Sequence, residues 1–197
     1  DFLQNDRFRD IRDVRSFDVV VEGRHKDELS SLFPSSVVFE YGEGEALSEN
    51  GAYNVRYISP DYDGGLNIIY GDSSSLLVPY SVFRFSDGKV TLSMLRKGKA
   101  ATTMKNFDYD ISGIYWTNVG TEFDQNTIFL PMEEADETVY FLTAIKNVDI
   151  DLCTKTLDEL GLSYKTWKEQ ESSLYAAFFV EKTMMYGVLS LLFIIIM

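Results

Sequence analysis

Residues 17–59 read FDVVVEGRHKDELSSLFPSSVVFEYGEGEALSENGAYNVRYIS, and this stretch decides the fold. β-Branched and aromatic residues predict three strands, over residues 17–22, 37–41 and 53–59. Between the first two strands, KDELSSLF over 26–33 predicts a short helix that ends at Pro34. Three glycines predict a turn before the last strand: Gly42, Gly44 and Gly51. The stretch therefore predicts a strand–helix–strand–strand unit, and the apolar spacing of residues 1–16 before it is roughly helical.

The segments that follow change character. Residues 61–65 and 71–75 are typical of loops, and four short strands are predicted over 82–85, 89–95, 109–116 and 127–130. An α/β pattern then returns: a strand over 139–146, a helix over 151–160 and a closing strand over 164–167. Asp149 or Asp151 is the predicted N-cap of that helix, and Gly161 lies just past its end.

We therefore expect an α+β protein in which a discontinuous α/β subdomain carries an inserted β-rich subdomain. The expected boundaries are 1–65 and 136–172 for the two α/β pieces and 66–135 for the insert. Residues 173–197 are expected to form a helix that enters a membrane, and from Glu169 onward it can run without a break.

The apolar run MMYGVLSLLFIIIM over 184–197 carries no charge. A membrane helix needs about 20 apolar residues, and this run approaches that length where the sequence stops. A buried core helix is the alternative, but such a helix shows a polar face that this run lacks. We therefore predict membrane attachment. Four residues at the membrane boundary are candidate lipid or cargo contacts, with ordinary packing as the alternative: Phe178, Phe179, Met184 and Met185.

Composition excludes some classes of protein. The 197 residues include 18 Lys and Arg against 31 Asp and Glu, a net charge of −13, which argues against a nucleic-acid binder. Hydrophobic residues make up 45% of the chain, as in globular proteins. The first residues show no signal-peptide pattern. Cys153 is the single cysteine, so no internal disulfide is expected, and its place on the apolar face of a helix predicts a buried thiol.

No residue pattern predicts an enzyme. His25 is the only histidine, and nothing selects a nucleophile for it. The stretch DYDGG over 61–65 resembles the start of a calcium loop but lacks its later glycine and glutamate, so an Asx-rich turn is expected. No phosphate-binding loop motif is present. We therefore expect no catalytic residue, no cofactor and no metal, and no binding or hydrolysis of ATP by this chain itself.

Residues 84–105 form a basic segment in an otherwise acidic chain. Six of them are Lys or Arg, and Asp87 is the single acid. The segment lies between two predicted strands, so it is expected either to project as a basic arm for an acidic or lipid-carrying partner or to be a solvated turn. The candidate arm residues are Arg96, Lys97, Lys99, Met104 and Lys105.

Several stretches together resemble the lipoprotein-releasing ABC transporter permeases. SLYAAFFVEKTMMYGVLSLLFIIIM over 173–197 is similar to the entry of that family's second membrane helix, preceded by a tryptophan-bearing strand. The residues that fit this pattern are Trp167, Leu174, Ala177, Glu181, Lys182 and Met185. SDGKVTL over 86–92 and GIYWTNVGTEFDQNTIFLPMEEA over 113–135 resemble two further stretches of the family. The resemblance covers residues 66–197 and extends to the first 60 only by the order of elements.

The resemblance implies a fold and a function. It implies a periplasmic domain with a porter-like α/β subdomain, similar to that of macrolide-exporter permeases, on the outer side of the inner (cytoplasmic) membrane. The implied partners are an ABC ATPase subunit, a second permease copy or paralogue, lipoprotein cargo and a periplasmic lipoprotein carrier. The implied activity is extraction of lipoproteins from the membrane and their transfer to the carrier.

Two departures from the family leave alternatives open. The segment 95–106 is short and lacks prolines, whereas the carrier-recruiting permease has a long hook there, and the linker after Leu66 lacks the usual longer helix. A cell-division permease, an efflux-type permease and a tail-anchored surface binding domain therefore remain alternatives.

Overall fold

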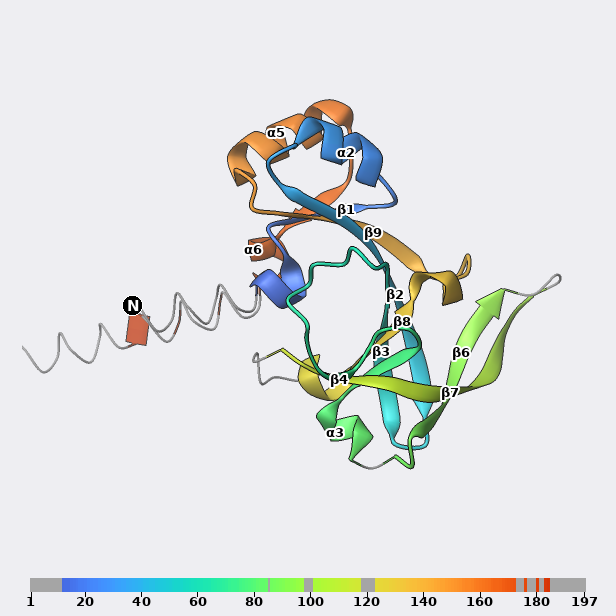
Figure 1. Ribbon diagram of the computed structural model, residues 1–197. Helices are drawn as coiled ribbons and strands as arrows, with labels where there is room; N and C mark the ends of the chain where they lie inside the picture. The colour runs from blue at the N-terminus through green and yellow to red at the C-terminus, as the bar shows by residue number, and fades with distance from the viewer. Residues whose placement is uncertain are drawn as a thin grey trace, which may run out of the picture.

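The computed structural model describes residues 12–84, 86–97, 101–117 and 123–172, and also Ala176, Val180, Thr183 and Met184. Within these residues the protein is a mixed α+β structure dominated by one ten-stranded sheet (Figure 1). The strands are β1 Val19–Glu22, β2 Val37–Ser48, β3 Gly51–Ile58, β4 Asn67–Gly71, β5 Leu76–Pro79, β6 Lys89–Lys97, β7 Thr102–Trp116, β8 Thr127–Pro131, β9 Tyr140–Lys146 and β10 Tyr164–Thr166. The helices are η1 Arg12–Ser16, α2 Lys26–Leu32, α3 Tyr80–Phe83, α4 Phe123–Asn126, η2 Met132–Glu134, α5 Ile150–Leu160 and α6 Trp167–Gln170.

The sheet has two parts that share β2. Six strands close into a ring in the order β2, β3, β8, β5, β7 and β6, because β6 pairs with both β7 and β2. The side chains inside this ring form the largest apolar cluster, which includes Leu76, Leu92, Met94 and Leu130. From the other half of β2 the strands β9, β1 and β10 extend as an open wing.

Two helices cover one face of the wing (Figure 1). Leu29 of α2 and Leu157 of α5 are fully buried against the strand residues Val19, Val21 and Ile145. Burial of each such side chain contributes about 1.5–3 kcal/mol to the free energy of unfolding. The opposite face of the wing carries an aromatic cluster that includes Phe17, Phe39 and Tyr41.

The predicted α/β elements are largely confirmed. The helix over 151–160 forms as α5, and the carboxylate of Asp149 accepts hydrogen bonds from the N–H groups of Asp151 and Leu152. Gly161 ends the helix with a φ of 68°, the left-handed conformation that glycine adopts without a steric cost. The predicted buried position of Cys153 is also confirmed, since its side chain is fully buried.

Other predictions are wrong in informative ways. Gly42 and Gly44 lie inside β2, and the turn falls at residues 49–50. A Cβ atom on Gly42 would come 2.4 Å from a methyl of Val139, so this glycine allows close packing within the strand. The predicted strand over 82–85 is wrong, since residues 80–83 form the short helix α3. The strands β4 and β5 form where a loop or no element was predicted. The division into subdomains at residues 65 and 135 stays a prediction.

Burial of Cys153 leads to a testable expectation. Burial raises the pKa of its thiol to about 11, and Asp18 adds to the rise. At pH 8 only about one thiol in a thousand is then ionised, so the folded protein should resist alkylation by iodoacetamide. Modification should become fast in 6 M guanidinium chloride, as followed by mass spectrometry. Fast modification of the native protein would show that α5 opens readily.

No helix among the described residues is long and apolar enough to cross a membrane. The apolar run over 185–197 lies outside the described residues. Ser172, Ala176, Val180, Thr183 and Met184 are helical, and the side chains of Val180 and Met184 are exposed. The predicted membrane helix therefore stays a prediction, but the predicted unbroken helix from Glu169 onward is wrong. Helix α6 ends at Gln170, and Glu171 is a turn residue with non-helical backbone angles.

Candidate functional site

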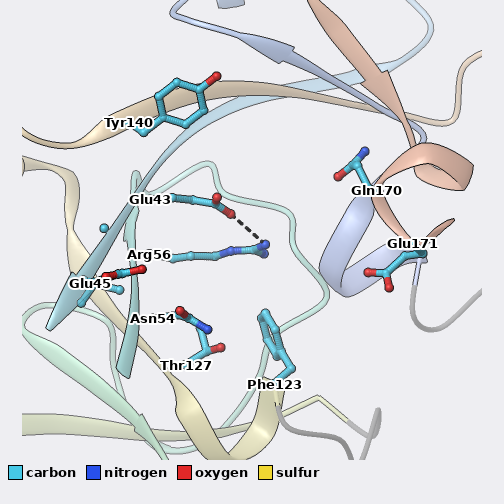
Figure 2. A pocket seen from close by; sticks show the side chains of 11 residues that line it. Glu43, Glu45, Asn54, Arg56, Phe123, Thr127, Tyr140, Gln170 and Glu171 are labelled. Atoms are coloured by element: carbon cyan, nitrogen blue, oxygen red, sulfur yellow. Dashed lines mark hydrogen bonds and ion pairs between the residues drawn. The ribbon is translucent and has the colours of Figure 1, made fainter. Parts of the chain in front are cut away.

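A cleft between the sheet and α6 is made of two adjoining pockets of about 460 and 580 Å³. Glu43, Tyr140 and Gln170 line both pockets. Figure 2 shows Glu43 and Arg56 extending from the sheet on one side and Gln170 and Glu171 on the α6 side. The cleft lies on the face of the wing that α2 and α5 leave uncovered, where Val20, Tyr41 and Leu142 form part of its wall.

Strand register brings the sheet residues of the cleft together. Glu43 of β2 lies directly opposite Arg56 of β3 and directly opposite Tyr140 of β9. Three neighbouring strands of the sheet, β9, β2 and β3, thus present Tyr140, Glu43 and Arg56 side by side, although Tyr140 is far from the other two in the sequence. The Arg56 guanidinium and a Glu43 carboxylate oxygen are 3.2 Å apart.

Arg56 is the central group of this wall, with only 7% of its surface exposed. Its guanidinium donates hydrogen bonds to the backbone carbonyl of Val14 in η1 and to the Tyr62 hydroxyl, both at 3.2 Å. It also lies 5.0 Å from the ring centre of Tyr41 and 5.1 Å from that of Phe123. Such cation–π contacts add stabilisation where the cation is desolvated.

Burial alone would lower the pKa of Arg56, but Tyr62, Tyr41 and Glu43 together raise it above its usual value. Arg56 is therefore a permanent cation. Arg56 belongs to β3 and binds Glu43 of β2, and both strands form the wall of the cleft. Its hydrogen bond to the Val14 carbonyl attaches η1 to this wall.

The other wall of the cleft is α6, which follows β10 without a loop. A capping box starts this helix: Glu169 accepts hydrogen bonds from the Thr166 N–H and hydroxyl, and these bonds lower the pKa of Glu169. The backbone N–H of Trp167 donates to the carbonyl of Asp18, which attaches α6 to the start of β1. Helix α6 also contacts η1, so the first and last elements within the described residues lie together.

Charged side chains of both signs line the cleft. Its charged lining is mainly acidic, with Glu22, Glu43, Glu45, Glu169 and Glu171 against Arg56 and Lys165. No group of three or more metal-ligating side chains occurs among the described residues. His25 lies elsewhere, with its Nδ1 atom 3.7 Å from a carboxylate oxygen of Glu28. Asp61 and Asp63 are paired with Lys26 and Lys146, which fits a turn better than a calcium loop.

The predicted basic arm is a hairpin of β6 and β7 (Figure 1). Arg96 is buried, lies 3.6 Å from Asp136 and stacks 5.1 Å from the ring centre of Phe107. Lys97 is exposed and pairs with Glu137. Two of the predicted arm residues, Arg96 and Lys97, therefore make ion pairs within the domain.

The remaining arm residues differ in their surroundings. Met104 and Lys105 are exposed, whereas Lys99 lies outside the described residues. Met104 lies directly opposite Leu95, and the two side chains are 52% and 54% exposed. The surface of the hairpin is thus apolar as well as basic, and its binding role stays a prediction. Among the predicted membrane-boundary residues, Met184 is exposed, and Phe178, Phe179 and Met185 lie outside the described residues.

A double substitution, Lys97→Glu with Lys99→Glu, tests the basic arm. We expect weaker binding to an acidic lipoprotein carrier and nearly unchanged stability, since the Lys97–Glu137 pair is exposed. Surface plasmon resonance at two salt concentrations measures the binding. Lys89→Glu, on the same hairpin but far from its tip, is the control. Unchanged affinity of the double variant would contradict the prediction.

The sequence gives no motif for the cleft. Arg56 stands between the apolar residues Val55 and Tyr57 in a predicted strand, and all three side chains are buried. An arginine between two apolar strand residues is the sequence signal that could have indicated the cleft. Its partners come from η1, β2 and the loop after β3, so only the folded chain assembles them. No protein-family model matches this chain, and neither does any curated protein compared with it.

Proposed function

We propose that this chain is the extracytoplasmic domain of an ABC transporter permease of the lipoprotein-releasing kind, and that it has no catalytic role of its own. The basis of the proposal is the resemblance of residues 66–197 to that family. The proposal includes a porter-like α/β subdomain and a location at the inner membrane. Lipoprotein extraction is the proposed activity, with hydrolysis of ATP on a separate subunit.

One structural observation carries the proposal: the first and last described elements of the body lie side by side. Helix α6 contacts η1, and β10 pairs with β1 immediately after η1. A domain inserted between two membrane helices begins and ends on the same face, because both helices enter the same bilayer. The exposed apolar side chains of Val180 and Met184, in helical residues beyond α6, fit a position at a membrane boundary.

The same arrangement suggests how movement would be transmitted. Arg56 binds the carbonyl of Val14 in η1, and Trp167 binds the carbonyl of Asp18, so both ends of the domain are attached to the sheet. Phe17, between them, has a φ of 53°, which is strained for a residue with a side chain, and the buried Ser16 hydroxyl has no hydrogen-bond partner among the described residues. A displacement of either membrane helix would therefore reach the cleft directly.

Affinity purification of the full-length protein from native membranes tests the proposal. We expect an ABC ATPase to co-purify in mild detergent, together with lipoproteins or their carrier, as identified by mass spectrometry. An ATPase accompanied by a cell-wall hydrolase or an efflux duct would assign the chain to another kind of permease. Absence of any ATPase would overturn the proposal in favour of a tail-anchored binding domain.

A further inference from the structure

The helical turn that leads into the sheet, η1, has an unusual register. Residues 12–16 form a π-helix, and the N–H of Phe17 donates to the carbonyl of Arg12, five residues back. An α-helix would instead join each N–H to the carbonyl four residues back. Single π-turns are frequent at functional sites, and a return to α-helical register would turn the chain before η1 by about 100°, the angle of one residue.

The hydroxyl of Ser16 is the first sign that the π register is not fully satisfied. Ser16 has 1% of its surface exposed, and its Oγ atom has no hydrogen-bond partner among the described residues. In α2 and α5, by contrast, the hydroxyls of Ser31 and Thr156 donate to the carbonyl four residues back, at 2.9 and 3.0 Å. The equivalent acceptor for Ser16 is the carbonyl of Arg12, which the π-turn directs to the N–H of Phe17.

The backbone of Phe17 is the second sign. Its φ of 53° is left-handed, a conformation that residues with a side chain seldom adopt. Its ring is fully buried and lies edge-on to the rings of Phe39 and Tyr41, with centroid distances of 5.1 and 5.6 Å. Packing therefore holds the ring in place, and the backbone next to the π-turn carries the strain.

Two contacts hold η1 in the π register against these costs. The buried guanidinium of Arg56 donates to the carbonyl of Val14 at 3.2 Å. The Nε atom of Arg12 lies 3.1 Å from a carboxylate oxygen of Asp18, whose carbonyl accepts from the N–H of Trp167 in α6. Since Arg56 and α6 belong to opposite walls of the cleft, the register of η1 is linked to both walls.

We propose that η1 is a two-state switch, with the π register seen here and an α-helical register of similar free energy. In the α register the carbonyl of Arg12 accepts from Ser16, and the backbone of Phe17 is released from its left-handed angle. Arg56 then loses the carbonyl of Val14 as an acceptor, so the cleft wall and the chain before η1 change together. The two registers go beyond the proposed function and do not depend on it.

Distances measured by pulsed EPR in the full-length protein in nanodiscs test the inference. Spin labels on cysteines that replace Asp13 in η1 and the exposed Lys155 in α5 report the rotation of η1 relative to the sheet. Cys153 is fully buried and should not react with the label. We expect two distances, one of which is the distance of the π register described here.

Two variants should move the populations in opposite directions. Arg56→Lys weakens the bond to Val14 and should shift the ratio about fivefold toward the second distance. Ser16→Ala removes the hydroxyl that only the α register satisfies, so it should shift the ratio about fivefold toward the π distance, alone and combined with Arg56→Lys.

Ser31→Ala is the matched control, because it removes a helical hydroxyl away from η1, and it should leave the ratio unchanged. One and the same single distance in the parent, Arg56→Lys and the double variant would overturn the inference. Two distances whose ratio Ser16→Ala does not change in the Arg56→Lys background would overturn it as well.

Discussion

Replacing Arg56 with alanine should lower the free energy of unfolding by about 3–5 kcal/mol, because it removes a large buried side chain together with its hydrogen bonds. The variant would leave the Glu43 carboxylate without its partner and the carbonyl of Val14 without its donor. It would also open a cavity between the rings of Tyr41 and Phe123. A urea titration followed by the fluorescence of Trp116 and Trp167 measures the loss.

Two further variants separate charge from geometry. Arg56→Lys keeps the positive charge but cannot make the same set of hydrogen bonds, so we expect a loss of about 2 kcal/mol. Lys89→Ala removes one partner of an exposed pair with Asp110 at 3.4 Å, and its effect should be close to zero. A loss below about 1 kcal/mol for Arg56→Ala would mean that Arg56 does not hold η1 to the sheet.

Replacing Gly71 with alanine should be nearly as damaging, for a purely steric reason. Gly71 has a φ of 73°, and a Cβ atom there would lie 1.9 Å from the backbone oxygen of Ser112. Ser112 cannot move aside easily, because its backbone oxygen accepts from the Asp72 N–H and its hydroxyl donates to the Asp72 carbonyl. We expect a loss of roughly 2–5 kcal/mol, the sum of left-handed strain and overpacking.

Gly88 provides the matched control for this prediction. Its φ is 81°, but a Cβ atom there would meet nothing within 4 Å. Gly88→Ala should therefore show only the left-handed strain, about 1–2 kcal/mol. Thermal unfolding of the two variants side by side measures the difference. Equal losses would show that the β4–β7 contact relaxes around an added methyl group.

Local patterns predicted the helices and strands whose side chains alternate clearly between buried and exposed. The helix α5 has both an N-cap and a terminal glycine, and β6 alternates between buried and exposed residues along most of its length. By contrast β4 is exposed at every residue, so it has no alternation to detect. The strand β5 is buried at every residue and only four residues long, which periodicity cannot separate from a loop or a helix.

Local sequence patterns could not predict how the strands are arranged in the sheet or which residues form the cleft, because both depend on contacts between distant segments. The ring closes because β6 pairs with β2 through Ala46 and Leu47, a contact that no neighbouring residues encode. Arg96 lies at a buried position of β6, and its ion pair with Asp136 depends on a loop far along the chain. Composition thus identified a basic segment, and tertiary contacts determined which of its charges face solvent.

The central place of β1 in the wing sets an order of events during synthesis. Its partners are β9 and β10, and Val20 lies opposite both Ala144 and Lys165. Translation from residue 131, where the ring strands are complete, to residue 166 takes roughly 2–7 s at ordinary rates. During that interval three consecutive valines, Val19, Val20 and Val21, have no strand beside them. The unpaired N–H and C=O groups of β1 are then open to pairing with another molecule, until β9 and β10 cover them.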